Sequence, residues 1–214
     1  MPLFSTDSTN VALTPCGPCA WLLQHEDHSL LTELSEAILE NPPPSFIEPV
    51  LGYDTLLFHF SSPIPEETLR SHIRSLTVGS HSRQERSRHI ISVRYNSPDL
   101  QEIADDLKLS REEIIQLHCA PTYTVRFLGF SPGFAYLDGL DTQLHLPRRS
   151  SPRTRIEPGS VAIGGSHAGI YTIPSPGGWN ILGHTDHPLF SPEKNDLTAF
   201  TLKPGDTLKF QSVD

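Results

Sequence analysis

The chain has 214 residues, enough for one large domain or two small ones, and its 36% hydrophobic and 19% charged content is typical of a globular protein. Its formal net charge of −9 disfavours nucleic-acid binding, since proteins of that class are usually basic over the binding surface. No apolar run reaches the roughly 18 residues of a membrane span, and the first residues lack the basic start and apolar core of a secretory signal. We therefore expect a cytoplasmic protein that contacts neither nucleic acid nor membrane.

The three cysteines are Cys16, Cys19 and Cys119, and the first two form the motif CGPC. An odd, low count argues against a disulfide framework. In a thioredoxin-type site the first cysteine follows a buried strand and begins a helix, which lowers its pKa. The residues before Cys16 make no convincing buried strand, and the stretch after Cys19 is too short to assure a helix. The motif therefore favours a Pro/Gly turn, and the sequence does not decide whether the thiols ever pair.

The first 80 or so residues alternate between strand and helix patterns. Residues 19–26 are a plausible strand, and 46–60 contain two short strand candidates. Between them Leu31, Leu34 and Ile38 recur at helical spacing. Pro65 opens a second helix over 66–76 with one apolar face. These elements predict a small two-layer α/β domain.

The polar stretch 79–89 has no apolar period and is typical of a linker. A strand is predicted at 88–95, then two short helices at 99–109 and 110–118. Ser110 and Glu113 form a capping box at the start of the second helix. A DNA-binding pair of helices is disfavoured, because the second helix carries one Arg and two Glu.

From Tyr123 onward the chain reads as almost all β. Short segments separated by Pro/Gly turns predict a closed barrel or a sandwich, with strands at 124–130, 160–165, 169–174, 179–184, 197–202 and 206–210.

Residues 129–133, GFSPG, match the G-x-S-x-G pattern of a nucleophilic serine. That motif needs a strand, a sharp turn and then a helix, but Gly139 follows too soon for a good helix. The residue after the serine must also donate its backbone N–H to the oxyanion hole, and here it is Pro132, which has none. We expect a rigid loop that holds backbone and aromatic groups against a ligand, rather than a nucleophilic Ser131.

Three linked motifs, LGFSPGFAYLDGL, LPRRSSPRTRIEPGSVAIGG and GIYTIPSPGGWNILGHT, stand in an order and spacing that resemble the KipI family. That family includes the B-type subunit of 5-oxoprolinase and allophanate-hydrolase subunit 1, and is similar to half of the carboxyltransferase domain (subdomain C and D) of urea carboxylase. The resemblance is strong over 88–183. It implies an α+β protein, with a small N-terminal two-layer α/β domain at 1–87 and a C-terminal cyclophilin-like β-barrel at 88–214.

The resemblance also implies a function. It is that of the B-type subunit of a heteromeric ATP-dependent 5-oxoprolinase, a hydrolase complex that converts 5-oxoproline, ATP and water to glutamate, ADP and phosphate. The implied partners are a paralogous C-type chain and an A-type protein of the same complex, without which the chain would be inactive. The chain has no P-loop motif, so ATP use rests on the resemblance alone. The alternatives are a component of an allophanate hydrolase or urea carboxylase-type enzyme, and a KipI-like regulator that inhibits a sensor histidine kinase.

Two sets of residues could carry catalysis. Arg148, Arg149, Arg153 and Arg155 lie within eight residues, either as a solvated basic face or as a site for carboxylate or phosphate. His118 falls in a stretch that matches the family's LH-x-x-P-x-Y pattern. It is either a general acid/base or a histidine favoured by the helix C-terminus. We assign His118, Arg148 and Arg149 as candidate catalytic residues.

The candidate substrate-binding residues are aromatic, glycine and loop residues of the three motifs, together with one arginine. Each aromatic could equally be a packing residue of the barrel, and the glycines allow close backbone approach to a ligand. The set is Phe130, Pro132, Gly133, Tyr136, Arg153, Tyr171, Gly177, Gly178 and Trp179.

Two departures from the family's usual pattern put the substrate in doubt. His167 stands where relatives often carry Gln, and His184 where they often carry Arg, so a permanent charge is lost at the second position. His184, Asp186 and His187 could suggest a metal, but no further ligands follow at a recognisable spacing, so we predict no metal site.

Overall fold

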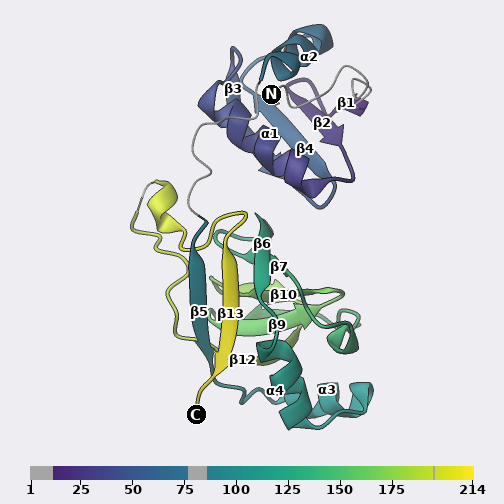
Figure 1. Cartoon of the computed structure of the whole chain (residues 1–214), viewed down its shortest axis with the longest axis vertical. Coiled ribbons are helices and arrows are strands. Elements are labelled where there is room, and N and C mark those ends of the chain that lie inside the picture. The colour runs from purple at the N-terminus through teal and green to yellow at the C-terminus, as the bar shows by residue number, and fades with distance from the viewer. Residues whose placement is uncertain (1–11, 77–85, 195) are drawn as a thin grey trace. The chain divides into compact units, whose positions relative to one another are not determined.

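The computed structural model describes residues 12–76, 86–194 and 196–214 (Figure 1). The chain divides into two compact units, Met1–Glu85 and Arg86–Asp214, whereas the predicted boundary falls after residue 87. Most of the predicted linker at 79–89 lies outside the described residues. No helix in the described ranges is long and apolar enough to span a bilayer.

The first unit is a four-stranded antiparallel sheet with two helices packed into one core. The sheet has the order β1-β2-β4-β3, and the helices supply the apolar faces that the sequence predicts, Leu31, Leu34 and Ile38 from one and Leu69 and Ile73 from the other. The elements are β1 (Ala12–Pro15), β2 (Ala20–Gln24), α1 (His28–Glu40), β3 (Phe46–Leu51), β4 (Thr55–Phe60) and α2 (Glu66–Ser75).

The CGPC motif forms the turn of the β1–β2 hairpin. The Cys16 amide donates to the carbonyl of Ala20 at 2.9 Å, and Gly17 has a φ of 72°. Both thiols are free, and α1 begins only at His28. Strand β1 was not expected because three of its four residues are exposed, so it carries no alternating apolar signal. The motif therefore lacks the helix N-terminus that lowers the pKa of a redox cysteine.

The second unit is a barrel-like sheet with the strand order β12-β9-β10-β7-β6-β13-β5. Strands β13 and β5 run parallel, side by side in Figure 1, and the other neighbouring pairs are antiparallel. Strands β8 and β11 pair with each other in a separate two-stranded sheet. The elements are β5 (Arg88–Val93), α3 (Asp99–Leu107), α4 (Arg111–Cys119), β6 (Tyr123–Leu128), β7 (Ala135–Asp138), η1 (Thr142–Leu144), β8 (Arg153–Ile156), β9 (Ser160–Gly164), β10 (His167–Ile170), β11 (Ser175–Gly177), β12 (Asn180–His184), η2 (Leu197–Ala199) and β13 (Thr207–Ser212).

The two edges of this sheet are joined by a single antiparallel bridge between Arg94 and His184. The Arg94 amide donates to the His184 carbonyl at 2.8 Å, and the His184 amide donates back at 2.9 Å. Because Arg94 follows β5 and His184 ends β12, this bridge joins the first and last strands of the order. The predicted α+β architecture with a C-terminal barrel is confirmed.

Helices α3 and α4 lie together at one end of the barrel (Figure 1). The predicted capping box is present, with Glu113 N–H donating to Ser110 Oγ and Ser110 N–H donating to the Glu113 carboxylate. Leu100, Ile103 and Ile114 are buried in the barrel core. The two helices therefore use their apolar faces to cover the barrel.

The predicted strand at 197–202 is wrong. Residues 197–199 form the 3₁₀ turn η2, and Phe200 makes only an isolated bridge to Phe190. The Asp196 carboxylate accepts from the Thr198 amide at 2.8 Å, a local bond that competes with strand pairing. Strand β7, which the sequence pattern does not predict, follows the GFSPG loop directly.

We predict that Gly183→Ala destabilises the barrel. A Cβ at this position would overlap the carbonyl oxygen of Arg94, a backbone atom that is itself held in the bridge. We expect a loss of about 2–3 kcal/mol in the free energy of unfolding, measured with urea. Gly129→Ala is the control, because its Cβ would meet Phe127 and Tyr136 at 3.5–3.6 Å, and should cost less than about 1 kcal/mol. Equal effects of the two substitutions would contradict the close approach of the two backbones at the Arg94–His184 bridge, which is the seam of the barrel.

Candidate functional site

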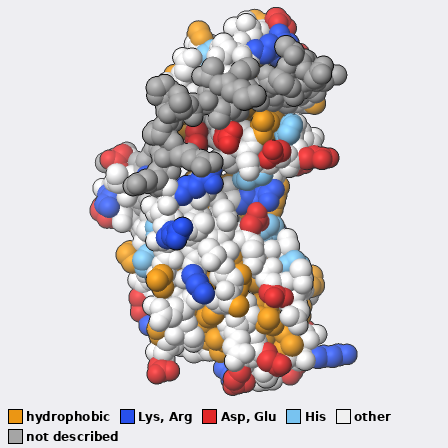
Figure 2. Space-filling view, viewed as in Figure 1, with side chains coloured by type: hydrophobic (Ala, Val, Ile, Leu, Met, Phe, Trp, Pro, Cys, Tyr) orange, Lys and Arg blue, Asp and Glu red, His pale blue; other side chains and the backbone are white. Residues whose placement is uncertain are grey.

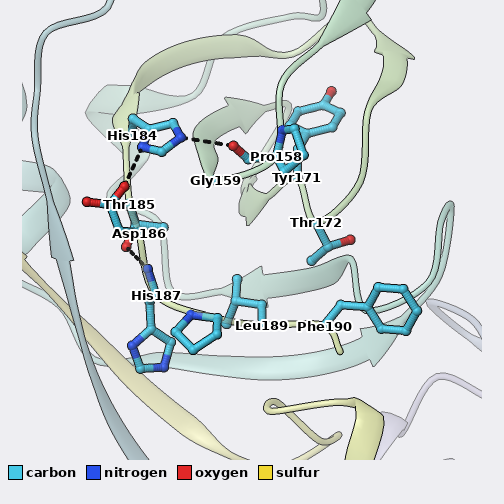
Figure 3. A pocket seen from close by; sticks show the side chains of 11 residues that line it. Pro158, Gly159, Tyr171, Thr172, His184, Thr185, Asp186, His187, Leu189 and Phe190 are labelled. Atoms are coloured by element: carbon cyan, nitrogen blue, oxygen red, sulfur yellow. Dashed lines mark hydrogen bonds and ion pairs between the residues drawn. The ribbon is translucent and has the colours of Figure 1, made fainter. Parts of the chain in front are cut away.

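A cavity of about 320 Å³ opens at the end of the barrel where the sheet closes (Figure 3). Three segments surround it: the turn before β9, the residues after β10, and the segment that follows β12. Its lining residues are Pro158, Gly159, Tyr171, Thr172, His184, Thr185, Asp186, His187, Pro188, Leu189 and Phe190.

The imidazole of His184 is fixed on both sides. Its Nε2 lies 2.9 Å from the carbonyl oxygen of Pro158, which can only accept, so Nε2 carries the proton. Nδ1 lies 3.4 Å from Arg94 Nη2, from which it accepts in the neutral ring, and 3.5 Å from an Asp186 carboxylate oxygen, with which it forms an ion pair in the protonated ring. Gly159 has to be glycine, since a Cβ there would lie 2.6 Å from His184 Nε2. His184 therefore ties the Pro158–Gly159 turn to the seam.

Arg94 and Asp186 form a bidentate ion pair beside this ring. The Arg94 Nη1 and Nη2 atoms donate to the two carboxylate oxygens of Asp186 at 2.8 and 2.9 Å. This bonding lowers the pKa of Asp186 and raises that of Arg94. Arg94 thus places a guanidinium beside His184, from directly across the Arg94–His184 bridge.

His187 is turned differently. Its ring points away from His184 in Figure 3, and its amide donates to Thr185 Oγ1 at 3.1 Å. Burial, and then the nearby charge of His89, lower the pKa of His187. Within the described ranges, no three His, Cys, Asp or Glu side chains are grouped to hold a metal ion.

His167 lies at the start of β10. Its Nδ1 is 3.0 Å from an Asp138 carboxylate oxygen, and Arg126 Nη1 donates to the other oxygen at 2.7 Å. Burial opposes the ionisation of Asp138, but the bonds from His167 and Arg126 outweigh it and lower the pKa of that carboxyl.

The predicted aromatic residues come together in one cluster around Phe134. The ring centroids of Phe130, Tyr136, Tyr171 and Trp179 lie 5.1–5.4 Å from that of Phe134. Tyr171 and Trp179 are buried, whereas Phe130 is 58% exposed. Tyr171 lines the cavity, Trp179 packs within the cluster, and Phe130 is largely exposed outside the cavity lining.

Hydrogen bonds hold the GFSPG loop at several points, and it forms no nucleophile elbow. The amide of Phe134 donates to the Ser131 carbonyl at 3.0 Å, and Thr172 Oγ1 donates to the Pro132 carbonyl at 2.6 Å. The chain then enters β7 rather than a helix. The Ser131 hydroxyl is buried and has no hydrogen-bond partner among the described residues. Gly133, with a φ of 76°, packs against Phe190 and Thr172 of the cavity wall.

The four clustered arginines do not share one site. Arg149 pairs with Glu102 at 2.7 Å, and Arg155 pairs with Glu157 at 2.6 Å. Arg153 pairs at 2.5 Å with an acid of α3, Asp99, whose other oxygen accepts from the Ile181 amide. No ion pair in the described ranges includes Arg148, which is exposed.

The predicted glycines hold the arginine segment in place. The Arg149 amide donates to the Gly178 carbonyl at 2.7 Å. Gly177 pairs with Arg153 in the β8–β11 ladder, and a Cβ on Gly177 would overlap the Tyr171 hydroxyl. On the face shown in Figure 2, Lys and Arg are scattered among acidic, His and apolar side chains in this unit.

His118 lies in the core rather than at the cavity. Its side chain has no exposed surface, its Nδ1 is 2.7 Å from the Tyr95 hydroxyl, and its ring stacks on Phe210 at 4.4 Å. Burial lowers its pKa to about 3. A catalytic role for His118 stays a prediction that this burial does not favour, because the ring has no contact with solvent.

A family model described as carboxyltransferase domain, subdomain C and D, matches residues 11–200. The chain belongs to this family. A Haemophilus influenzae relative, named as the B subunit of 5-oxoprolinase, is 40% identical over 168 residues, which are 77% of this chain and 78% of that protein. The resemblance drawn from the three sequence motifs is therefore confirmed.

Two further matches of this carboxyltransferase-domain chain cover less of the other protein. An Escherichia coli O157:H7 protein, also named as the B subunit of 5-oxoprolinase, is 45% identical over 113 residues, 53% of this chain and 51% of that one. The crystal structure of TTHA0988 superposes with a TM-score of 0.81 at 33% identity, over 91% of this chain and 39% of that chain. The chain thus spans about half of the E. coli protein and about two fifths of TTHA0988.

We predict that His118 makes the barrel less stable in acid. Below the ordinary histidine pKa of about 6.5, His118 binds a proton in the unfolded chain. In the folded chain its pKa is about 3, so it stays unprotonated over most of that range. The free energy of unfolding should therefore fall by up to about 1.4 kcal/mol per pH unit over that window. His118→Gln keeps an acceptor for Tyr95 but does not titrate.

The measurement is urea unfolding followed by Trp179 fluorescence, with Trp21→Phe in every protein. Between about pH 6.5 and pH 5.5, the chain with His118 should lose about 1 kcal/mol more than His118→Gln. Identical losses would show that His118 does not stay neutral in the folded barrel.

Proposed function

We propose that the chain is a B-type subunit of an ATP-dependent 5-oxoprolinase, which opens the lactam of 5-oxoproline to glutamate at the expense of ATP. The observation that carries the proposal is the 40% identity, over more than three quarters of both chains, to a protein named as the B subunit of 5-oxoprolinase. The chain acts together with a C-type and an A-type protein of the same complex, and is inactive alone.

The cavity supports a division of ligands within that complex. At about 320 Å³ it lies at the lower end of the range of roughly 300–1,000 Å³ for small-molecule pockets. Its walls include Leu189, Phe190 and Pro188, with His184 and Asp186 at the polar side. A five-membered lactam suits this space and mixture, and the chain has no P-loop motif for a nucleotide. We therefore assign the lactam to this chain and ATP to a site that the other proteins of the complex supply.

Arg148 is the proposed catalytic arginine. Of the four clustered arginines it is the one left without an acidic partner in the described part of the chain. Phosphorylation of a lactam oxygen would build negative charge, and a guanidinium stabilises such charge through bidentate hydrogen bonds. Arg149 and Arg153 hold the segment in place through Glu102 and Asp99.

The test is phosphate release from ATP by this chain co-expressed with its C-type partner and mixed with an A-type protein. We expect release that depends on both 5-oxoproline and this chain. Arg148→Ala should lower kcat by at least about tenfold through the lost charge-assisted bond. Arg155→Ala is the matched control and should leave kcat unchanged, because Arg155 is already paired with Glu157.

An intact complex that releases no phosphate in response to 5-oxoproline would overturn the proposal. In that case allophanate and urea are the next substrates to supply, since the family model is that of a carboxyltransferase domain.

A further inference from the structure

Arg94 presents its guanidinium to a carboxylate at the rim of the cavity. Both terminal nitrogens are engaged, at 2.8 and 2.9 Å from the two oxygens of Asp186. Two parallel N–H···O bonds are the preferred geometry for recognition of a carboxylate by arginine. The two terminal nitrogens of Arg94 form a fork that binds the Asp186 carboxylate. Asp186 is a lining residue, so the carboxylate held by the Arg94 fork belongs to the cavity.

This internal pair can be opened at little cost. The Arg94 and Asp186 side chains are 38% and 70% exposed, and exposed ion pairs contribute little to stability because water solvates both partners when they separate. The backbone of Arg94 is held by the seam, on both its amide and its carbonyl. Arg94 is therefore the fixed half of the pair, and Asp186 is the half that can turn to solvent.

The histidine beside the Arg94 fork and three of the clustered arginines already have partners of their own. His184 Nε2 donates to Pro158, and its Nδ1 lies 3.4 Å from Arg94 Nη2 and 3.5 Å from an oxygen of Asp186. Arg149, Arg153 and Arg155 have their own acids elsewhere.

We propose that Arg94 is the carboxylate-binding residue of the cavity, and that Asp186 occupies its guanidinium until the carboxylate of a small acid replaces it. The exchange breaks and makes only hydrogen bonds. The cavity beyond the fork would then hold the ring or chain of that acid against Leu189 and Phe190. Naming the acid as 5-oxoproline rests on the proposed function; recognition of a carboxylate does not.

The experiment measures binding to the full chain, without partners, by chemical-shift titration. Three probes separate the parts of the ligand: L-5-oxoproline, acetate as a carboxylate without the lactam, and 2-pyrrolidinone as the lactam without a carboxylate. Arg94→Gln should weaken binding of both acids by at least about tenfold. Asp186→Asn should tighten both by about two- to fivefold, because the competing carboxylate is gone. Binding of 2-pyrrolidinone should be unchanged in both variants.

Glu157→Gln is the matched control, since it removes one negative charge from another exposed Arg–carboxylate pair of the same unit. It should leave all three affinities unchanged. An Asp186→Asn protein that binds the acids no better than wild type, or an Arg94→Gln protein that binds them equally well, would overturn the proposal, as would failure of both acids to bind any variant. If the binding pattern holds but the assembled complex releases no phosphate, the carboxylate site stands and the 5-oxoprolinase function is what fails.

Discussion

Two backbone hydrogen bonds between Arg94 and His184 close the barrel, and the site is built on that closure. They join strands whose bridging residues are 90 positions apart in the chain. A backbone pair at this point brings the two side chains to the same edge, where Arg94 reaches both His184 and Asp186. The close approach leaves room only for glycine at position 183. The segment after β12, which forms much of the cavity wall, starts from this fixed point.

The rest of the barrel supports the cavity by satisfying its own polar groups. Asp99 ties α3 to both Arg153 and the β12 backbone, and Glu102 ties α3 to Arg149. The aromatic cluster around Phe134 packs directly on the sheet because the facing positions are small: a Cβ on Gly164 would lie 2.7 Å from Trp179, and one on Gly169 would lie 2.8 Å from Phe134. The charged and aromatic side chains that the sequence predicts as ligand-binding groups thus have largely structural contacts. What stays open to a ligand is the cavity, Arg148 and Phe130.

The sequence predicts well those features that depend on near neighbours. Helical spacing locates α1 and α2, the Ser110–Glu113 box marks the start of α4, and the missing N–H of Pro132 is enough to argue against a nucleophilic serine. Three motifs indicate the family, because their order and spacing are unusual. Strands β1 and β7 are only four residues long, too short for a periodic signal, and the Asp196 turn displaces the strand predicted at 197–202.

Long-range pairing decides the features that the sequence does not predict. His118 lies in the last turn of α4, where a histidine can favour the helix dipole, and Tyr95, Tyr123 and Phe210 pack against its ring in the core. The four arginines form one cluster in the sequence, but three of them pair with acids that come from α3 and from the adjacent turn. Arg94 and Asp186 meet beside His184 through a bridge that no local pattern reveals.

Native-state hydrogen exchange of the Arg94 and His184 amides tests the central claim, that this bridge is an integral closure of the barrel. We expect both amides to exchange as slowly as that of Ile163 in β9, through unfolding of the whole barrel, because both donate across the seam. Fast exchange at Arg94 and His184, with β9 still protected, would show that the seam opens locally. The cavity would then lack the fixed Arg94–His184 edge that holds Arg94 beside Asp186.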